Sequence, residues 1–177
     1  LVLDRLGFSA AEITACRTAQ TKALRRAQEA IVERGGFNWQ LLTQVNAVTN
    51  TTCLARMRSM CSPPRYQTRV AWQMNVYENW QSEIHGWPFI PDFTQRLAAF
   101  LLGRGPYAWF GYGFAGCDFV VAPEFLQAAE GKGPLSIKLG KPSEDCHEVN
   151  SSGVFTRRWS SGKQTTLDCN KWAATLT

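Results

Sequence analysis

Residues 91–117, PDFTQRLAAFLLGRGPYAWFGYGFAGC, constrain the fold more than any other part of the chain. They predict a helix that Asp92 caps, with Gln95 three residues later as in a capping box, and that ends at Gly103. After a Gly-Pro turn, residues 107–114 form an apolar stretch without a charge on either alternating face. A strand buried on both faces usually belongs to a parallel sheet that helices cover. The stretch therefore predicts an α/β fold.

An earlier stretch repeats this order of helix and strand. Ser9 and Glu12 form a capping box that begins a long helix, and Gly35-Gly36 ends it. Residues 37–43, FNWQLLT, then read as a strand. We expect this strand and the strand at 107–114 to lie side by side in one parallel sheet. The apolar stripe of the long helix, which we expect to be buried, is Ile13, Cys16, Leu24, Ala27 and Ile31.

The remaining segments are predicted less directly. Residues 44–66 read as irregular, and apolar residues at helical spacing predict a helix within 67–84. Residues 122–130 predict a short helix, and 153–169 predict an antiparallel hairpin around a glycine turn. A length of 177 residues suits a single domain, 1–177.

The cysteines and glycosylation sequons indicate an oxidising, secretory route. The six cysteines are even in number and contain no CxxC pair, and the sequons at Asn50 and Asn150 each lie within four residues of a cysteine. Cys53 and Cys61 are expected to close a short local loop, whereas the other four allow several pairings. All six are predicted to form disulfides: Cys16, Cys53, Cys61, Cys117, Cys146 and Cys169.

Several classes of function are disfavoured by the sequence. The net charge is +5, but the basic residues are scattered rather than clustered, which argues against a nucleic-acid binder. No apolar run reaches membrane-spanning length. His85 and His147 are the only histidines and lack metal-ligand spacing, and no glycine-rich phosphate loop follows a strand. We therefore expect no metal and no organic cofactor.

Three segments in order carry a resemblance to a known family. They are the RGPYAWFGYGF of 104–114, the LGKP of 139–142 and the GVFTRRW of 153–159. Together they resemble the C-terminal part of barrel-type glycoside-hydrolase-like proteins, many of them uncharacterised. The resemblance implies a (β/α) barrel with a closing antiparallel hairpin, and carbohydrate as the substrate class. Because an eight-unit barrel takes about 250 residues, the chain is expected to be the C-terminal portion or a processed fragment of a longer barrel protein.

Candidate catalytic groups follow from the chemistry of glycoside hydrolysis. The reaction generally needs two carboxyl groups that flank the scissile bond, and in a barrel they project from the C-terminal ends of strands. Asp118 follows the strand at 107–114, and Glu78 and Glu83 lie in an aromatic neighbourhood. The alternatives are a loop carboxylate beside Cys117 for Asp118, and a solvated helix face for Glu78 and Glu83.

Aromatic side chains are the candidate sugar-binding groups. Sugar rings pack their C–H faces on flat aromatic rings, while amide side chains bond the hydroxyls. The candidates are Trp39, Gln40, Trp87, Trp109 and Tyr112. Packing in the core is the alternative role for Trp39 and Trp109.

Two functions of different classes remain open. The first is a secreted protein related to barrel glycosidases that acts on or binds a polysaccharide, by carboxylate acid/base chemistry if it is catalytic. The second is a non-catalytic extracellular module, structural or glycan-binding, built on a degenerate barrel. Because bare edges of a parallel sheet risk aggregation, another chain that completes the sheet is a further expected partner.

Overall fold

The computed structural model describes residues 7–43, 50–62, 70–75, 92–105, 107–111 and 123–177. The chain divides into two compact units. The first comprises Leu1–Asn38 and Pro64–Val70, and the second comprises Trp39–Pro63 and Ala71–Thr177.

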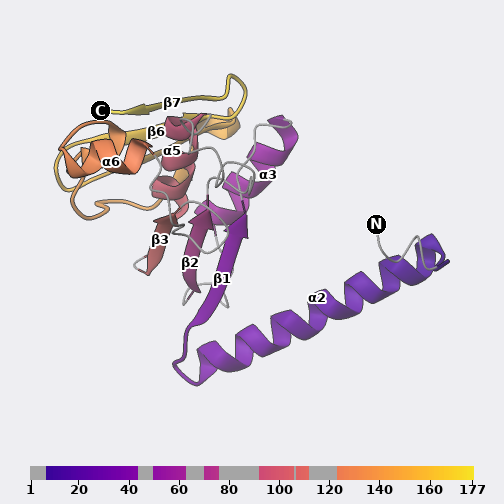
Figure 1. Ribbon diagram of the computed structural model, residues 1–177. Coiled ribbons are helices and arrows are strands. Elements are labelled where there is room, and N and C mark those ends of the chain that lie inside the picture. Colours follow the sequence, from indigo (N-terminus) through magenta and orange to yellow (C-terminus); the bar gives the residue numbers. More distant parts are fainter. Residues whose placement is uncertain (1–6, 44–49, 63–69, 76–91, 106, 112–122) are drawn as a thin grey trace. The chain divides into compact units, whose positions relative to one another are not determined.

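The first unit contains the long helix α2, Ala10–Glu33, in which the predicted capping box is confirmed (Figure 1). The Oγ of Ser9 accepts a hydrogen bond from the Glu12 amide at 3.3 Å, and the Glu12 carboxylate accepts one from the Ser9 amide at 2.8 Å. The helix ends at Glu33, Arg34 is its C-cap, and Gly35 follows with a φ of 77°, a conformation that glycine adopts without strain. The local sequence therefore determines both ends of α2.

The apolar stripe of α2 is not buried as predicted. Ile13 is the one buried residue of the helix, whereas Cys16 and Ala27 are exposed and Leu24 is 57% exposed. Capping and helix propensity are local and can form a helix without a partner, but burial of its stripe requires a second surface. Periodicity alone does not supply that surface.

The second unit contains most of a three-stranded sheet whose spatial order follows the chain order. The strands are β1 (Asn38–Thr43), β2 (Val70–Asn75) and β3 (Ala108–Gly111). β2 and β3 are parallel, with Trp72 opposite Ala108 and Asn75 opposite Gly111. Helix α3 (Asn50–Cys61) lies between β1 and β2 in sequence, and α5 (Phe93–Gly103) lies between β2 and β3. Strands and helices thus alternate through this part of the chain.

Two predictions about this sheet are wrong. The segment expected to be a helix within 67–84 forms β2 over Val70–Asn75, and residues 76–84 lie outside the described part. The predicted strands at 37–43 and 107–114 share a sheet but are not neighbours, because β2 lies between them. A short apolar run fits both helical and strand spacing, so pairing between strands decided the outcome here.

Helix α5 is the most buried element of the described chain. The predicted stripe of Phe93, Leu97, Phe100 and Leu101 is buried, and Ala98, Ala99 and Leu102 are buried as well. One side of α5 packs on β3, and the helix also contacts β6 (Gln164–Asp168) and β7 (Ala173–Leu176) of a second sheet (Figure 1). A helix that is covered on more than one side needs apolar residues around most of its circumference.

The capping box predicted for α5 is wrong, although the helix and its end at Gly103 are confirmed. Asp92 has a left-handed backbone with a φ of 55° and makes no side-chain capping bond. The amide of Gln95 instead donates to the backbone carbonyl of Trp172 at 3.1 Å. The tertiary contact with the turn before β7 has replaced the local one.

The C-terminal part is an antiparallel sheet in the order β4-β5-β6-β7. The predicted hairpin is confirmed as β5 (Val154–Arg158) paired with β6, joined by a turn at Gly162. Two strands were not predicted, β4 (His147–Glu148) and β7. The short helix predicted at 122–130 is confirmed as α6 (Pro123–Ala129), and two short 3-10 helices lie at Pro134–Ser136 and Val149–Ser151.

Helix α3 lies within the region 44–66 that was predicted to be irregular. Cys53 and Met57 are almost completely buried, and Met60 is 9% exposed. These residues follow helical spacing, a signal that the polar residues around them obscured. Residues 44–49 and 63–66 lie outside the described part.

Candidate functional site

The two faces of β3 have different environments. Phe110 lies on the face that the helices cover, where its ring is 5.1 Å from that of Phe100 and 5.7 Å from that of Phe93. The ring of Phe125 in α6 stacks on Phe110 at 6.1 Å. These four aromatic rings hold β3, α5 and α6 together as one packed layer.

The opposite face of β3 presents an exposed indole. Trp109 is 55% exposed, because neighbouring residues in a strand alternate between faces and Phe110 occupies the packed one. Tyr107, which precedes β3, is 49% exposed. The prediction that this strand is buried on both faces is therefore wrong for the described residues. Within the described part of the chain, helices cover the face of β3 that carries Phe110.

An exposed indole on a sheet face can bind a ligand with a flat apolar side. Among the described residues, the cation–π contacts involve Trp159 and none involves the Trp109 ring. Gln73 of β2 is the register partner of Trp109 in the parallel pair. An exposed aromatic ring is a surface on which the C–H face of a sugar ring can pack.

The other predicted binding residues are divided between the sheet and the undescribed part. Trp39 and Gln40 lie in β1, in the same sheet as Trp109 with β2 between them. Trp87 and Tyr112 lie outside the described residues. The predicted catalytic carboxylates lie outside them as well: Asp118, Glu78 and Glu83.

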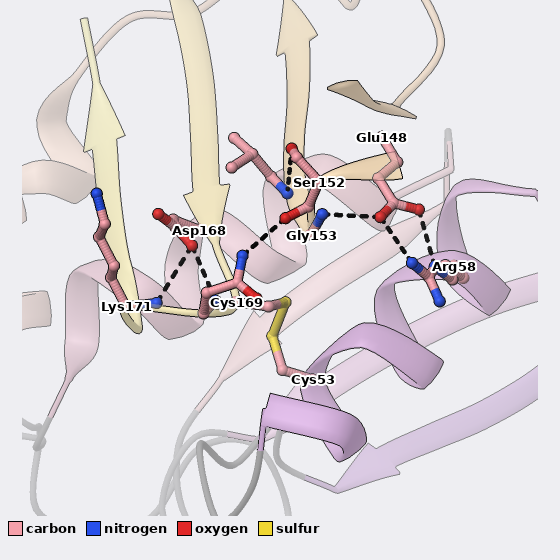
Figure 2. The surroundings of a disulfide bond; sticks show 10 residues. Cys53, Arg58, Glu148, Ser152, Gly153, Asp168, Cys169 and Lys171 are labelled. Atoms are coloured by element: carbon pink, nitrogen blue, oxygen red, sulfur yellow. Dashed lines mark hydrogen bonds and ion pairs between the residues drawn. A yellow bond between two sulfur atoms is a disulfide. The ribbon is translucent and has the colours of Figure 1, made fainter. Parts of the chain in front are cut away.

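Two disulfides connect α3 to the antiparallel sheet. Cys53 pairs with Cys169 (Figure 2). Cys61 pairs with Cys146. The prediction that Cys53 and Cys61 close a local loop is wrong, because both lie in one helix and face the sheet.

The two remaining cysteines differ from this pattern. The thiol of Cys16 is free and exposed on α2, so its predicted disulfide is not present. Cys117 lies outside the described residues.

An ion pair reinforces the same junction (Figure 2). The guanidinium of Arg58 in α3 donates from Nε and Nη2 to the two oxygens of Glu148, each at 2.8 Å. Glu148 also accepts a hydrogen bond from the Gly153 amide at 2.8 Å. The hydrogen bonds from Arg58, followed by that from Gly153, hold the pKa of Glu148 below its usual value, and the pKa of Arg58 is raised by the same contact.

The two sequons lie in different settings. Asn150 is exposed in the short 3-10 helix and has a left-handed backbone with a φ of 47°, so its side chain is accessible for modification. Asn50 is the first residue of α3 rather than part of a loop. An accessible acceptor and two disulfides are compatible with an extracellular protein.

A buried arginine was missed by the sequence analysis. Arg157 of β5 is 8% exposed and donates from Nη1 to the carbonyls of Leu101, Leu102 and Arg104 at the end of α5, and from Nε to that of Glu144. Its guanidinium lies 5.6 Å from the ring centre of buried Trp159. Alternation along the hairpin places residue 157 on the same face as Phe155 and Trp159, and this was the available signal.

Two comparisons of this chain with known proteins give no match. No protein-family model matches it. No curated protein matches it either.

Among the described helices, none combines the length and the apolar character needed to cross a bilayer.

Proposed function

We propose that this chain is part of a (β/α) barrel related to glycoside hydrolases, and that it binds a polysaccharide outside the cell. Two observations support the barrel. The strand order β1-β2-β3 follows the chain, with a helix between successive strands, and β2 and β3 are parallel. Consecutive strands of a barrel are neighbours in this way. Each half of a doubly wound sheet has the same local order, so the resemblance of 104–114, 139–142 and 153–159 is what favours the barrel.

The exposed indole of Trp109 carries the proposal for glycan binding. Helices cover the other face of β3, so Trp109 corresponds to a position on the inner face of a barrel. A sugar ring that stacks on Trp109 buries apolar surface that is otherwise in contact with water. Trp39 and Gln40 of β1, with Trp87 and Tyr112, are the proposed further contacts.

If the protein is catalytic, we place the acid/base pair at the carboxyl edge of the sheet. Glu78 follows the end of β2 by three residues in sequence, and Asp118 follows the end of β3. The carboxyl ends of parallel strands meet at one edge, which is where barrel enzymes place their chemistry. Glu83 is the alternative partner for Asp118.

Glycan binding is tested with the intact, disulfide-bonded chain on a polysaccharide array. We expect Trp109→Ala to lower binding at least tenfold, on the order of the 1–3 kcal/mol that a stacked aromatic contributes. Phe8→Ala removes a comparably exposed aromatic from the other unit and is the matched control. Unchanged binding by Trp109→Ala, or an equal loss in Phe8→Ala, would remove the sugar-binding proposal.

Hydrolysis of a bound polysaccharide separates the enzyme from the non-catalytic module. Release of reducing ends that Asp118→Asn and Glu78→Gln abolish supports the glycosidase. Binding without hydrolysis supports a non-catalytic glycan-binding module.

The proposed partner chain pairs with an edge of the three-stranded sheet. Among the described strands, β1 and β3 lie at its edges. A second chain that pairs with either edge covers unpaired backbone groups. Sedimentation that shows only a monomer at micromolar concentration would contradict this partner.

A further inference from the structure

A cavity lies on the helix-covered side of β3, away from Trp109. It has a volume of about 300 Å³ and lies between α5, Phe110 and the segment 134–140. Its walls are aliphatic and aromatic side chains, with the guanidinium of Arg104 as the charged group among them. Because Phe110 and Trp109 point to opposite faces of β3, this cavity is independent of the proposed sugar site.

Among the described residues, no ion-pair partner faces Arg104. Its guanidinium is half-buried and lies 5.2 Å from the ring centre of Trp159. Its Nε is buried and has no hydrogen-bond partner, and among the described residues no carboxylate forms an ion pair with it. Burial lowers the pKa of Arg104, as expected for a cation without compensation.

The neighbouring cation increases the local positive charge. The guanidinium of Arg157 also lies over the Trp159 ring. It donates its hydrogen bonds to backbone carbonyls, which carry no net charge. Asp145 is the acidic group that acts on Arg157. Two guanidinium groups therefore meet at one indole, which favours an anion at Arg104.

We propose that this cavity binds a small free monocarboxylate with an apolar tail. The carboxylate pairs with Arg104 and supplies the acceptor that its Nε lacks, after a rotation of the arginine side chain. The tail lies between α5 and residues 134–140, against Phe110. At about 30 Å³ for each water-sized group, the cavity holds roughly ten non-hydrogen atoms. Hexanoate has a suitable size and charge.

The first test compares hexanoate with hexanol on the intact chain. Titration followed by NMR is expected to give saturable hexanoate binding with a Kd below about 5 mM, and binding of hexanol that is at least tenfold weaker. Shifts are expected at Phe110, Leu101 and Ile137. Equal binding of the acid and the alcohol, shifts confined to other parts of the chain, or no saturation would overturn the proposal.

Two variants test the roles of charge and volume separately. Arg104→Gln is expected to weaken hexanoate binding at least tenfold and to leave hexanol unchanged, whereas Arg158→Gln removes an exposed guanidinium from β5 and is the matched control. Ile137→Trp fills the cavity, retains Arg104 and is expected to abolish binding of both ligands. If Arg104→Gln does not fold, hexanoate binding by Ile137→Trp tests the proposal. Hexanoate binding unchanged by Ile137→Trp would overturn the proposal.

Discussion

The disulfide between Cys53 and Cys169 makes a prediction that can be worked out in numbers. It connects α3 to the end of β6 across 116 residues. Both cysteines are buried, at 1% and 4% exposure. The double variant Cys53→Ala/Cys169→Ala removes the bond without leaving an unpaired thiol.

The expected loss in the free energy of unfolding follows from the length of the loop that this bond closes. The second disulfide, Cys61–Cys146, lies inside the first, so most of the 116-residue loop is already closed when it is intact. The remaining loop consists of the segments between Cys53 and Cys61 and between Cys146 and Cys169, which is roughly 31 residues. Chain-entropy reasoning then gives a loss of about 3.7 kcal/mol in the free energy of unfolding. For a protein of this size, the Tm falls by about 7–15 °C.

Urea unfolding under non-reducing conditions measures this loss. Trp159 is 1% exposed, so its fluorescence shifts to longer wavelength when the antiparallel sheet unfolds. Wild-type protein with both disulfides reduced is the reference for loss of the two bonds together, and it is expected to be less stable than the double variant. A decrease below about 1 kcal/mol with an unchanged m-value would refute the reasoning, because the bond would then not constrain the unfolded chain.

Three further predictions concern the same half of the chain. Arg157→Met leaves the carbonyls at the end of α5 unpaired, so chemical denaturation is expected to show a loss of about 3 kcal/mol, with little change in the exposed control Arg158→Met. Because the pKa of Glu148 is lower in the folded state, its contribution to stability is present above about pH 4.3 and is lost as the pH falls through the folded value. Glu148→Gln should therefore make the Tm fall less steeply as the pH is lowered from about 5 to 3. An equally steep fall in the variant would contradict a contribution of the Glu148 carboxylate to stability. Expression through a secretory pathway is expected to add a glycan at Asn150, and Asn150→Gln should lower the intact mass by that glycan; an unchanged mass would show that the site is unused.

The elements predicted correctly are those whose signals lie within a few residues. Capping by Ser9 and Glu12 gave the start of α2, and Gly103 gave the end of α5. The hairpin of β5 and β6 followed from alternation around Gly162. Each of these signals acts through hydrogen bonds or backbone conformations within one turn of the chain, so no distant segment is needed to form it.

The candidate site was predicted only in part. Trp109 was named as a candidate binding residue, and its exposure contradicts the prediction of a doubly buried strand. Arg104 and Arg157 were not named: alternation places Arg157 on the face of Trp159, but nothing in the local sequence shows that Arg104 meets the same ring. The proximity of these guanidinium groups depends on residues more than 50 positions apart.

Signals within the local sequence are sufficient for the ends of α2, the end of α5 and the hairpin of β5 and β6. The tertiary structure alone decided that 70–75 is a central strand, that Cys53 and Cys61 reach to the distant sheet, and that Gln95 bonds Trp172 instead of capping its own helix. The physical reason is that strand pairing, disulfide formation and burial are interactions between surfaces far apart in the chain. Their free energies outweigh the local preferences of about 1 kcal/mol or less that a sequence window reveals.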